Sequence, residues 1–299
     1  MGYQGSRARG FPPVGYRREV ARTRKLFSAL TRRGPHKVLR GDLAFAGIPG
    51  VVYTPATGYG LPAVAFGHDW LCDTDDYAET CRHLASWGIV AAAPNTQRGL
   101  APSVLNLGHD LGATLDVITG VRLGPGQISV APAKLALAGH GFGAAAAIFA
   151  AGAGGTRTPK AVVAVFPAVT RPSAEAAAAN LSIPGLVLAT PDDGKSLRTD
   201  AFEVAERWPG SVLRVVDKAA ATSLPEEHGL TGLLGVPRRS TGPQQTVRAL
   251  MTGFLLFQLT GDKTYREFAE ADAEFRRVSR PESAPPPVAP EDRIVSLFR

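Results

Sequence analysis

Short apolar runs alternate with longer amphipathic stretches along residues 38–280. Runs that are apolar at nearly every position are typical of strands buried on both faces of a parallel sheet, and the stretches between them have helical periodicity. We predict strands at 38–45, 50–55, 62–67, 88–94, 134–139, 161–167, 185–190 and 211–216. We predict helices near 73–87, 103–120, 144–150, 196–208, 243–260 and 262–278. The pattern indicates an α/β protein, with a mostly parallel sheet covered by helices on both faces and an antiparallel first pair of strands.

Composition divides the 299 residues into three parts. Residues 1–37 form a basic extension, 38–280 a single domain, and 281–299 a proline-rich tail. Residues 1–40 contain eleven Lys and Arg and one acid, whereas the whole chain carries a net charge of +7, so the domain itself is slightly acidic. We expect residues 1–16 and the tail to be disordered because they are rich in glycine, arginine and proline.

A short amphipathic helix is predicted at residues 17–33 of the extension. Its narrow apolar stripe lies among arginines and consists of Val20, Leu26, Phe27 and Leu30. One interpretation is a helix packed on the domain with its cations in solvent. The alternatives are a segment that lies on an anionic membrane surface or docks on a protein partner. Nucleic-acid binding is disfavoured because no aromatic residues are interleaved with the cations.

The cysteines and histidines indicate neither a disulfide nor a metal site. Cys72 and Cys81 flank a predicted helix and are too far apart along it to pair. His83 and His109 have no second ligand at a suitable spacing, so we expect no metal and no cofactor. The sequence has no apolar run of membrane-spanning length and no apolar signal core. The expected location is therefore the cytoplasm, with peripheral attachment to a membrane as an alternative.

Residues 134–150 place a glycine-rich turn between a strand and an alanine-rich helix. The turn from Gly139 to Gly143 has the outline of G-x-S-x-G, a sharp strand-to-helix turn that exposes a nucleophilic serine. Its middle residue is Gly141, which has no side chain to attack a carbonyl. A dinucleotide-binding turn would require an acidic residue at the end of the next strand, and a P-loop would require Gly-Lys-Ser/Thr. The sequence has neither at this place.

Other segments occur in the order expected of a hydrolase. PAVAFGHDW leads into Gly67-His68-Asp69-Trp70, where such enzymes place a loop that supplies an oxyanion donor. The strand 185–190 is followed by Asp192-Asp193, where the acid of a catalytic triad would stand. GHDLGATLDVI precedes the elbow, and GFLLFQLTGDKTYREF lies near the end. On these segments the chain resembles the α/β-hydrolase superfamily over about residues 40–275, and more narrowly its dienelactone hydrolase and bacterial cutinase (polyester hydrolase) branch.

The resemblance implies a triad with two of its three positions unfilled. The nucleophile position matches Gly141, and the acid position matches Asp193 with Asp192 beside it. The histidine is expected within residues 217–223, which contain none. His228 lies a few residues later and would serve only if its loop folds back.

The implied oxyanion donors are the backbone N–H groups of Trp70 and Phe142, which do not depend on the side chain at position 141. Loss of a nucleophile costs orders of magnitude in rate. We therefore interpret the chain as a hydrolase-fold protein that has lost serine ester hydrolysis. It would bind an acyl or ester-like ligand, or a protein partner, and its pocket would include His68, Asp69 and His140.

The alternative hypothesis is an active carboxylic ester hydrolase with displaced catalytic groups. The candidates for these groups are His140, His68, Asp69, Ser223 and His228. Cys72 is a weaker candidate because it has no obvious base. Each has a structural explanation as well: His140 packs behind the turn, His68 braces it, and Asp192 or Asp193 caps the following helix. A third hypothesis is an interaction protein that acts through its arm or tail and has a filled pocket.

Overall fold

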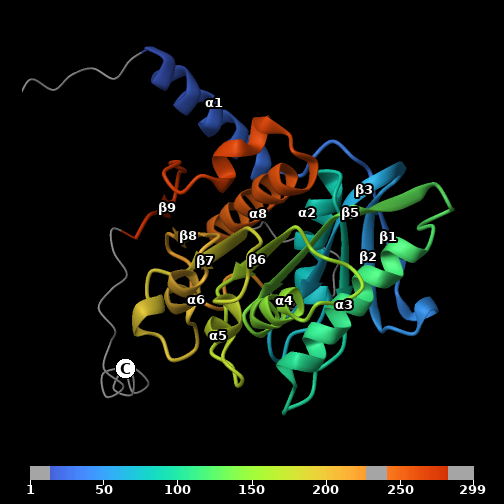
Figure 1. Cartoon of the computed structure of the whole chain (residues 1–299). Helices are drawn as coiled ribbons and strands as arrows, with labels where there is room; N and C mark the ends of the chain where they lie inside the picture. The colour runs from blue at the N-terminus through green and yellow to red at the C-terminus, as the bar shows by residue number, and fades with distance from the viewer. Residues whose placement is uncertain (1–13, 227–240, 282–299) are drawn as a thin grey trace, which may run out of the picture.

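A mostly parallel sheet of nine strands forms the centre of the part described by the computed structural model, residues 14–226 and 241–281 (Figure 1). The strand order is β1-β2-β4-β3-β5-β6-β7-β8-β9. Neighbours from β4 through β8 pair in parallel, whereas β1, β2 and β9 are antiparallel to their neighbours. The strands are β1 (Val38–Asp42), β2 (Gly50–Pro55), β3 (Gly58–Gly67), β4 (Val90–Pro94), β5 (Ile128–His140), β6 (Ala161–Val165), β7 (Gly185–Ala189), β8 (Ser211–Val216) and β9 (Val278–Ser279).

Helices cover both faces of this sheet (Figure 1). One face carries α1 (Val14–Leu30), α2 (Ala78–Ser86) and α8 (Gly242–Thr260), and the other carries α3 (Val104–Gly120), α4 (Phe142–Gly152), α5 (Ala174–Ala178) and α6 (Ala201–Arg207). Successive side chains of a strand point to opposite faces, so Val64 and Phe66 of β3 pack with the first group and Ala63 and Ala65 with the second. The predicted α/β class, with helices on both faces and an antiparallel first pair, is confirmed.

Capping residues define the two longest helices of the domain. The Ser103 side chain accepts a hydrogen bond from the Asn106 N–H at the start of α3, which fits the predicted start. At α8, Thr241 and Gln244 form a reciprocal capping box. Gly261 ends α8 with a positive φ of 73°.

The predicted helix at 262–278 is wrong. The chain forms the 3-10 helix η4 (Lys263–Ala269), then an irregular stretch and β9. Arg214, buried in β8, donates from Nη1 to the carbonyl of Ala273 at 2.8 Å and from Nη2 to the carbonyl of Glu270. The carbonyls of Glu270 and Ala273 therefore accept hydrogen bonds from a side chain and not from the backbone N–H groups of a helix. The guanidinium also lies over the ring of Phe275, 4.9 Å from its centroid.

Other boundaries differ by a few residues. The predicted strand 38–45 ends at Asp42, because Asp42 Oδ1 accepts the N–H of Ala44 and starts the 3-10 turn η1 (Ala44–Ala46). The predicted helix 73–87 begins as the 3-10 turn η2 (Asp75–Tyr77), and the predicted helix 196–208 is only α6. The short helix α5 was not predicted, and β3 and β5 are longer than predicted because they pair with each other from Gly58 onward.

The predicted basic helix 17–33 is present as α1, and its side chains are described from residue 22 on. Phe27 and Leu30 are buried in the core beside α8, whereas Arg22, Arg24 and Lys25 are exposed. The described part of α1 is thus packed on the domain with its cations outward. The disorder predicted for residues 1–16 is wrong at 14–16, because α1 begins at Val14. The predictions for residues 1–13 and 282–299 lie outside the described residues. Within the described ranges, no helix combines the length and the apolar character needed to cross a bilayer.

We expect Arg214→Met to lower the free energy of unfolding by about 2 kcal/mol, because two carbonyls would lose their buried donor. Urea unfolding measures this change, and hydrogen exchange should increase at residues 270–279. Arg207→Met, at an exposed arginine of α6, is the control and should change stability little. Equal stability of the two variants would contradict the role given to Arg214.

Candidate functional site

The turn between β5 and α4, which in sequence has the outline of a nucleophile elbow, has a strained backbone at Gly141. Gly141 has φ 52° and ψ −116°, a conformation that residues with a side chain rarely adopt. Its N–H donates to the carbonyl of Val165 at 3.0 Å, and its carbonyl accepts from the N–H of Ala168 at 3.0 Å. Gly143 lies so close to Gly67 that a Cβ at position 143 would collide with the end of β3. The start of α4 is therefore packed directly on the loop after β3.

The Asp69 carboxylate occupies the space in front of this turn. Asp69 Oδ1 accepts two backbone hydrogen bonds of 2.8 Å, one from Trp70 N–H and one from Phe142 N–H. A Cβ placed on Gly141 would lie 2.6 Å from Asp69 Oδ2 and closer still to Oδ1. The two N–H groups expected to bind an oxyanion thus converge on one oxygen of the protein itself. The Asp69 side chain is about a quarter exposed.

His140 is buried behind the turn with both ring nitrogens engaged. Nε2 lies 2.7 Å from the carbonyl of Ala221 and donates to it. Nδ1 lies 2.8 Å from the hydroxyl of Tyr77, which in turn accepts the N–H of Asp69 at 3.1 Å. Burial lowers the pKa of His140, against the opposing effect of Asp69, whose Oδ2 is 3.8 Å from Nδ1. A neutral ring that accepts from Tyr77 satisfies every one of these contacts.

Tyr77 was not among the predicted site residues, although it joins the two loops of the site. Its ring packs 5.1 Å from Phe66 and 5.8 Å from His140, measured between centroids. Burial raises the pKa of Tyr77 well above its ordinary value, so the hydroxyl keeps its proton and donates. The only sequence signal was an apolar-face tyrosine close to the loop after the strand 62–67.

His68 braces the loop after β3. The ring is buried, with Nδ1 2.9 Å from the carbonyl of Asp69 and Nε2 2.7 Å from the carbonyl of Thr96. Both contacts are to backbone, so His68 fixes the direction of the loop that carries Asp69 and Trp70. This geometry agrees with the bracing explanation rather than with a displaced base.

The loop after β8 supplies a carbonyl where the resemblance implied a histidine. Ala221 contacts His140 through its carbonyl, and Ser223 uses its hydroxyl to accept the N–H of Ala220 at 2.7 Å. His228 lies outside the described residues. The structure therefore brings Asp69, Trp70, Phe142 and His140 together around Gly141, and it keeps the Ser223 hydroxyl in a local turn.

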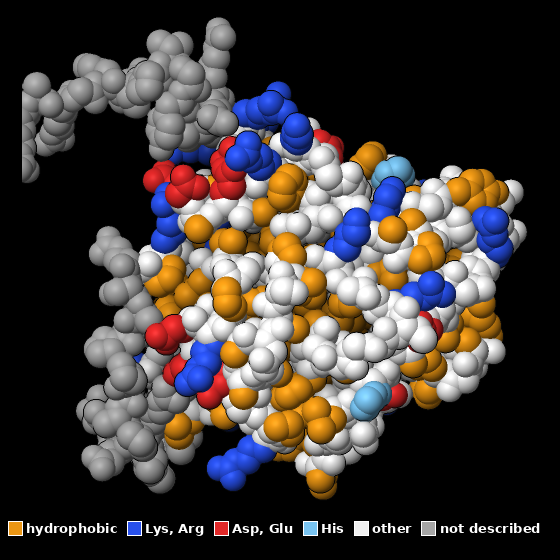
Figure 2. Space-filling model, in the orientation of Figure 1, with side chains coloured by type: hydrophobic (Ala, Val, Ile, Leu, Met, Phe, Trp, Pro, Cys, Tyr) orange, Lys and Arg blue, Asp and Glu red, His pale blue; other side chains and the backbone are white. Residues whose placement is uncertain are grey.

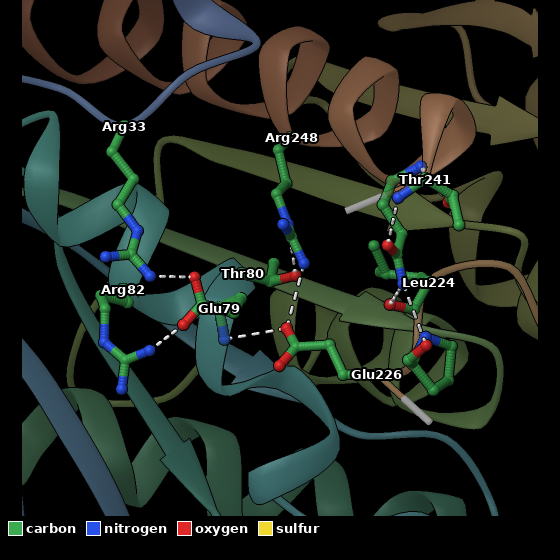
Figure 3. A network of polar contacts seen from close by, with 10 residues as sticks. Arg33, Glu79, Thr80, Arg82, Leu224, Glu226, Thr241 and Arg248 are labelled. Carbon is green, nitrogen blue, oxygen red and sulfur yellow. Dashed lines mark hydrogen bonds and ion pairs between the residues drawn. The ribbon is translucent and has the colours of Figure 1, made fainter. Parts of the chain in front are cut away.

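A buried ionic network holds this loop in place (Figure 3). Arg248 of α8 donates from Nε to Thr80 Oγ1 and from Nη2 to Glu226 Oε1, both at 3.0 Å. Glu226 Oε1 also accepts the N–H of Glu79 at the start of α2. Gln244 donates to the carbonyls of Leu224 and Pro225.

Figure 3 shows the Glu79 carboxylate between two further cations, Arg33 and Arg82. The charges of α2, α8 and the loop after β8 are thus linked, and burial lowers the pKa of Arg248 against the effect of Glu226. The signal in the sequence was Arg248, the one charged residue of the segment 243–260.

The Asp193 side chain binds the start of the following helix, α6. It begins the 3-10 turn η3 (Asp193–Lys195), is buried, and accepts the N–H of Phe202 on Oδ2 at 3.1 Å. Burial raises its pKa from 3.8 to about 6. Asp192 is exposed.

Asp200, which was not predicted as a site residue, has its pKa raised to about 8 by burial and by the charge of Asp193. In the described part of the chain, Oδ1 of Asp193 and Oδ1 of Asp200 have no hydrogen-bond partner.

Neither thiol is activated. Burial raises the pKa of Cys72 to about 11 and that of Cys81 to about 12, so both stay protonated at neutral pH. Over the described ranges, no group of three or more His, Cys, Asp or Glu side chains is arranged to hold a metal ion.

We expect Asp200→Asn to raise the free energy of unfolding at pH 8 by about 1–3 kcal/mol. The folded protein keeps the Asp200 proton up to about pH 8, whereas the unfolded chain releases it near 3.8. The folded state therefore binds more protons in this interval, and its stability falls as pH rises. The asparagine variant should flatten this dependence and differ little near pH 4. Urea unfolding across this range tests it against Asp192→Asn, and lower stability of Asp200→Asn at pH 8 would contradict it.

Comparisons with known proteins identify no relative of this chain among family models or curated proteins. The function of the chain therefore has to be inferred from the turn at Gly141, the carboxylate of Asp69 and the side chains around them.

Proposed function

We propose that this chain is an α/β-hydrolase-fold protein, related to the dienelactone hydrolase and cutinase branch, that has lost serine ester hydrolysis and acts by binding. The observation that carries the proposal is the Asp69 carboxylate, which accepts both N–H groups at the elbow. The positive φ of Gly141 between β5 and α4 supports the fold assignment, because nucleophile elbows require such a strained turn.

The filled elbow argues against ester hydrolysis. An ester carbonyl would have to displace a carboxylate from two charge-assisted hydrogen bonds, each of which is stronger than a neutral one. A negative charge at Asp69 would also repel the oxyanion that forms during acyl transfer. His140 has both nitrogens engaged and would have to break a hydrogen bond to act as a base. The alternative, an active hydrolase with displaced groups, would depend on Asp69 as the attacking group, since it lies nearest to Gly141.

The surroundings of the elbow favour a partner with an apolar surface. The loops after β3, β4 and β6 lie at the same sheet edge as the elbow, because these strands and β5 are adjacent and parallel. They expose Trp70 (50%), Leu71 (62%), Leu100 (84%) and Val169 (50%). Large apolar side chains exposed together mark interaction surfaces. We infer a protein partner at this edge, with an acyl or ester-like ligand as the second candidate.

We expect the purified protein to hydrolyse p-nitrophenyl acetate and butyrate no faster than buffer. Asp69→Asn and His140→Ala are the matched variants, measured beside it. Turnover by the wild type that either substitution abolishes would overturn the proposal in favour of displaced catalytic groups.

A double-mutant cycle tests whether Asp69 and Gly141 share one space. We expect Gly141→Ala to lower the free energy of unfolding by about 3 kcal/mol, from backbone strain plus the collision with Asp69. In an Asp69→Gly background the same substitution should cost only about 1 kcal/mol, since the strain alone remains. Urea unfolding of the four proteins gives the coupling energy, and additive effects would show that the two positions are independent.

A further inference from the structure

A cavity of about 670 Å³ lies between the end of α1, the first turns of α8 and the segment 274–277, and none of the described residues that line it belongs to the elbow. Its apolar wall includes Phe27 and Phe275, whose ring centroids are 5.4 Å apart. Figure 1 draws α1 against α8, and Figure 2 shows Lys and Arg together with Asp and Glu side chains at this upper edge of the molecule. The volume is in the range of sites for small organic ligands.

The polar wall of the cavity is cationic. Arg24, Arg276 and Arg277 line it, and none of them forms an ion pair with a described residue. Among the described residues of the lining, the one acid is Glu274, which pairs with Arg280 at 3.3 Å. The lining therefore has an excess of positive charge, which favours an anion with more than one negative charge.

The domain holds the segment that carries Arg276 and Arg277 in place. Arg214 fixes the segment before it through the carbonyls of Glu270 and Ala273. Arg277 has a positive φ of 63°, and its carbonyl accepts the N–H of Asp217 at 3.0 Å. Its guanidinium lies against Gly242, where a Cβ would be 2.7 Å from Nη1. The absence of a side chain at position 242 thus makes room for this guanidinium.

Two of the first backbone N–H groups of α8 are already hydrogen-bonded within the protein. At the start of α8, the N–H of Gln244 is capped by Thr241 Oγ1, and the N–H of Gln245 donates to the Thr241 carbonyl. Pro243 has no N–H. An anion in the cavity would accordingly be held by guanidinium groups, which bind phosphate in a forked, two-bond geometry.

We propose that this cavity binds the phosphate group of a phosphomonoester that carries an apolar or aromatic body. A phosphomonoester has a charge between about −1.5 and −2 near pH 7, which would offset at least half of the charge of Arg24, Arg276 and Arg277. The apolar body would lie along Phe27 and Phe275. This site is independent of the proposed function at the elbow.

Isothermal titration of the full chain with phenyl phosphate and with inorganic phosphate tests the proposal for a soluble ligand. Flotation with phosphatidylcholine vesicles, with and without phosphatidic acid, tests a lipid phosphomonoester as the source. Binding of phenyl phosphate that is tighter than binding of inorganic phosphate supports a soluble ligand, and flotation only with phosphatidic acid supports a lipid. Failure of both overturns the proposal.

Matched variants locate the binding. We expect Arg24→Ala and Arg277→Ala each to weaken binding about tenfold, since each removes a charge-assisted contact. Gly242→Ala should weaken it without loss of charge, because the new Cβ displaces the Arg277 guanidinium. Arg122→Ala, at an exposed arginine over Tyr59, is the control for net charge and should change affinity less than about twofold. Equal losses in Arg122→Ala and Arg277→Ala would show nonspecific attraction and overturn the site.

Discussion

The hydrogen bonds from Trp70 N–H and Phe142 N–H to Asp69 Oδ1 determine the state of the whole elbow. A side chain at position 141 would exclude the carboxylate, and the carboxylate excludes a side chain there. The glycine and the aspartate therefore depend on each other. Two N–H groups that converge on one point need an acceptor there, and Asp69 supplies one that is always present. The turn keeps its strained backbone because this internal acceptor stabilises it.

The rest of the site extends from the backbone of Asp69 as a series of hydrogen bonds. Asp69 N–H donates to Tyr77, Tyr77 donates to His140, and His140 donates to the carbonyl of Ala221. The loop of Ala221 is in turn fixed to α2 and α8 through Glu226 and Arg248 (Figure 3). Burial raises the pKa of Tyr77, which therefore keeps its proton and acts as a hydrogen-bond donor, and burial lowers the pKa of His140, whose neutral ring can accept on Nδ1. A satisfied buried network of this kind specifies one arrangement of these side chains.

The elements that the sequence predicted correctly are those set by local patterns. Apolar runs placed the central strands, and Ser103 marked the start of α3. The elbow was identifiable from its glycines, because close packing of Gly143 on Gly67 leaves no alternative residue. Long-range contacts could not be anticipated: Arg214 broke the helix predicted after residue 262, and Asp69 met its donors from two separate loops. A carboxylate in a loop has the same local sequence whether it faces solvent or an anion site.

Electrostatics distinguishes the elbow from the cavity beside α1 and α8. At the elbow, the N–H dipoles already have an anion, so an external anion gains contacts there only by displacing Asp69. Beside α1 and α8, the guanidinium groups of Arg24, Arg276 and Arg277 have no ion-pair partner among the described residues. These three arginines are exposed, so water and salt screen their charges, and a bound anion would stabilise the folded protein through its affinity for them. Among the described residues, the arginine-lined cavity is therefore the place where an added anion meets cations that have no carboxylate partner, whereas at the elbow it meets Asp69.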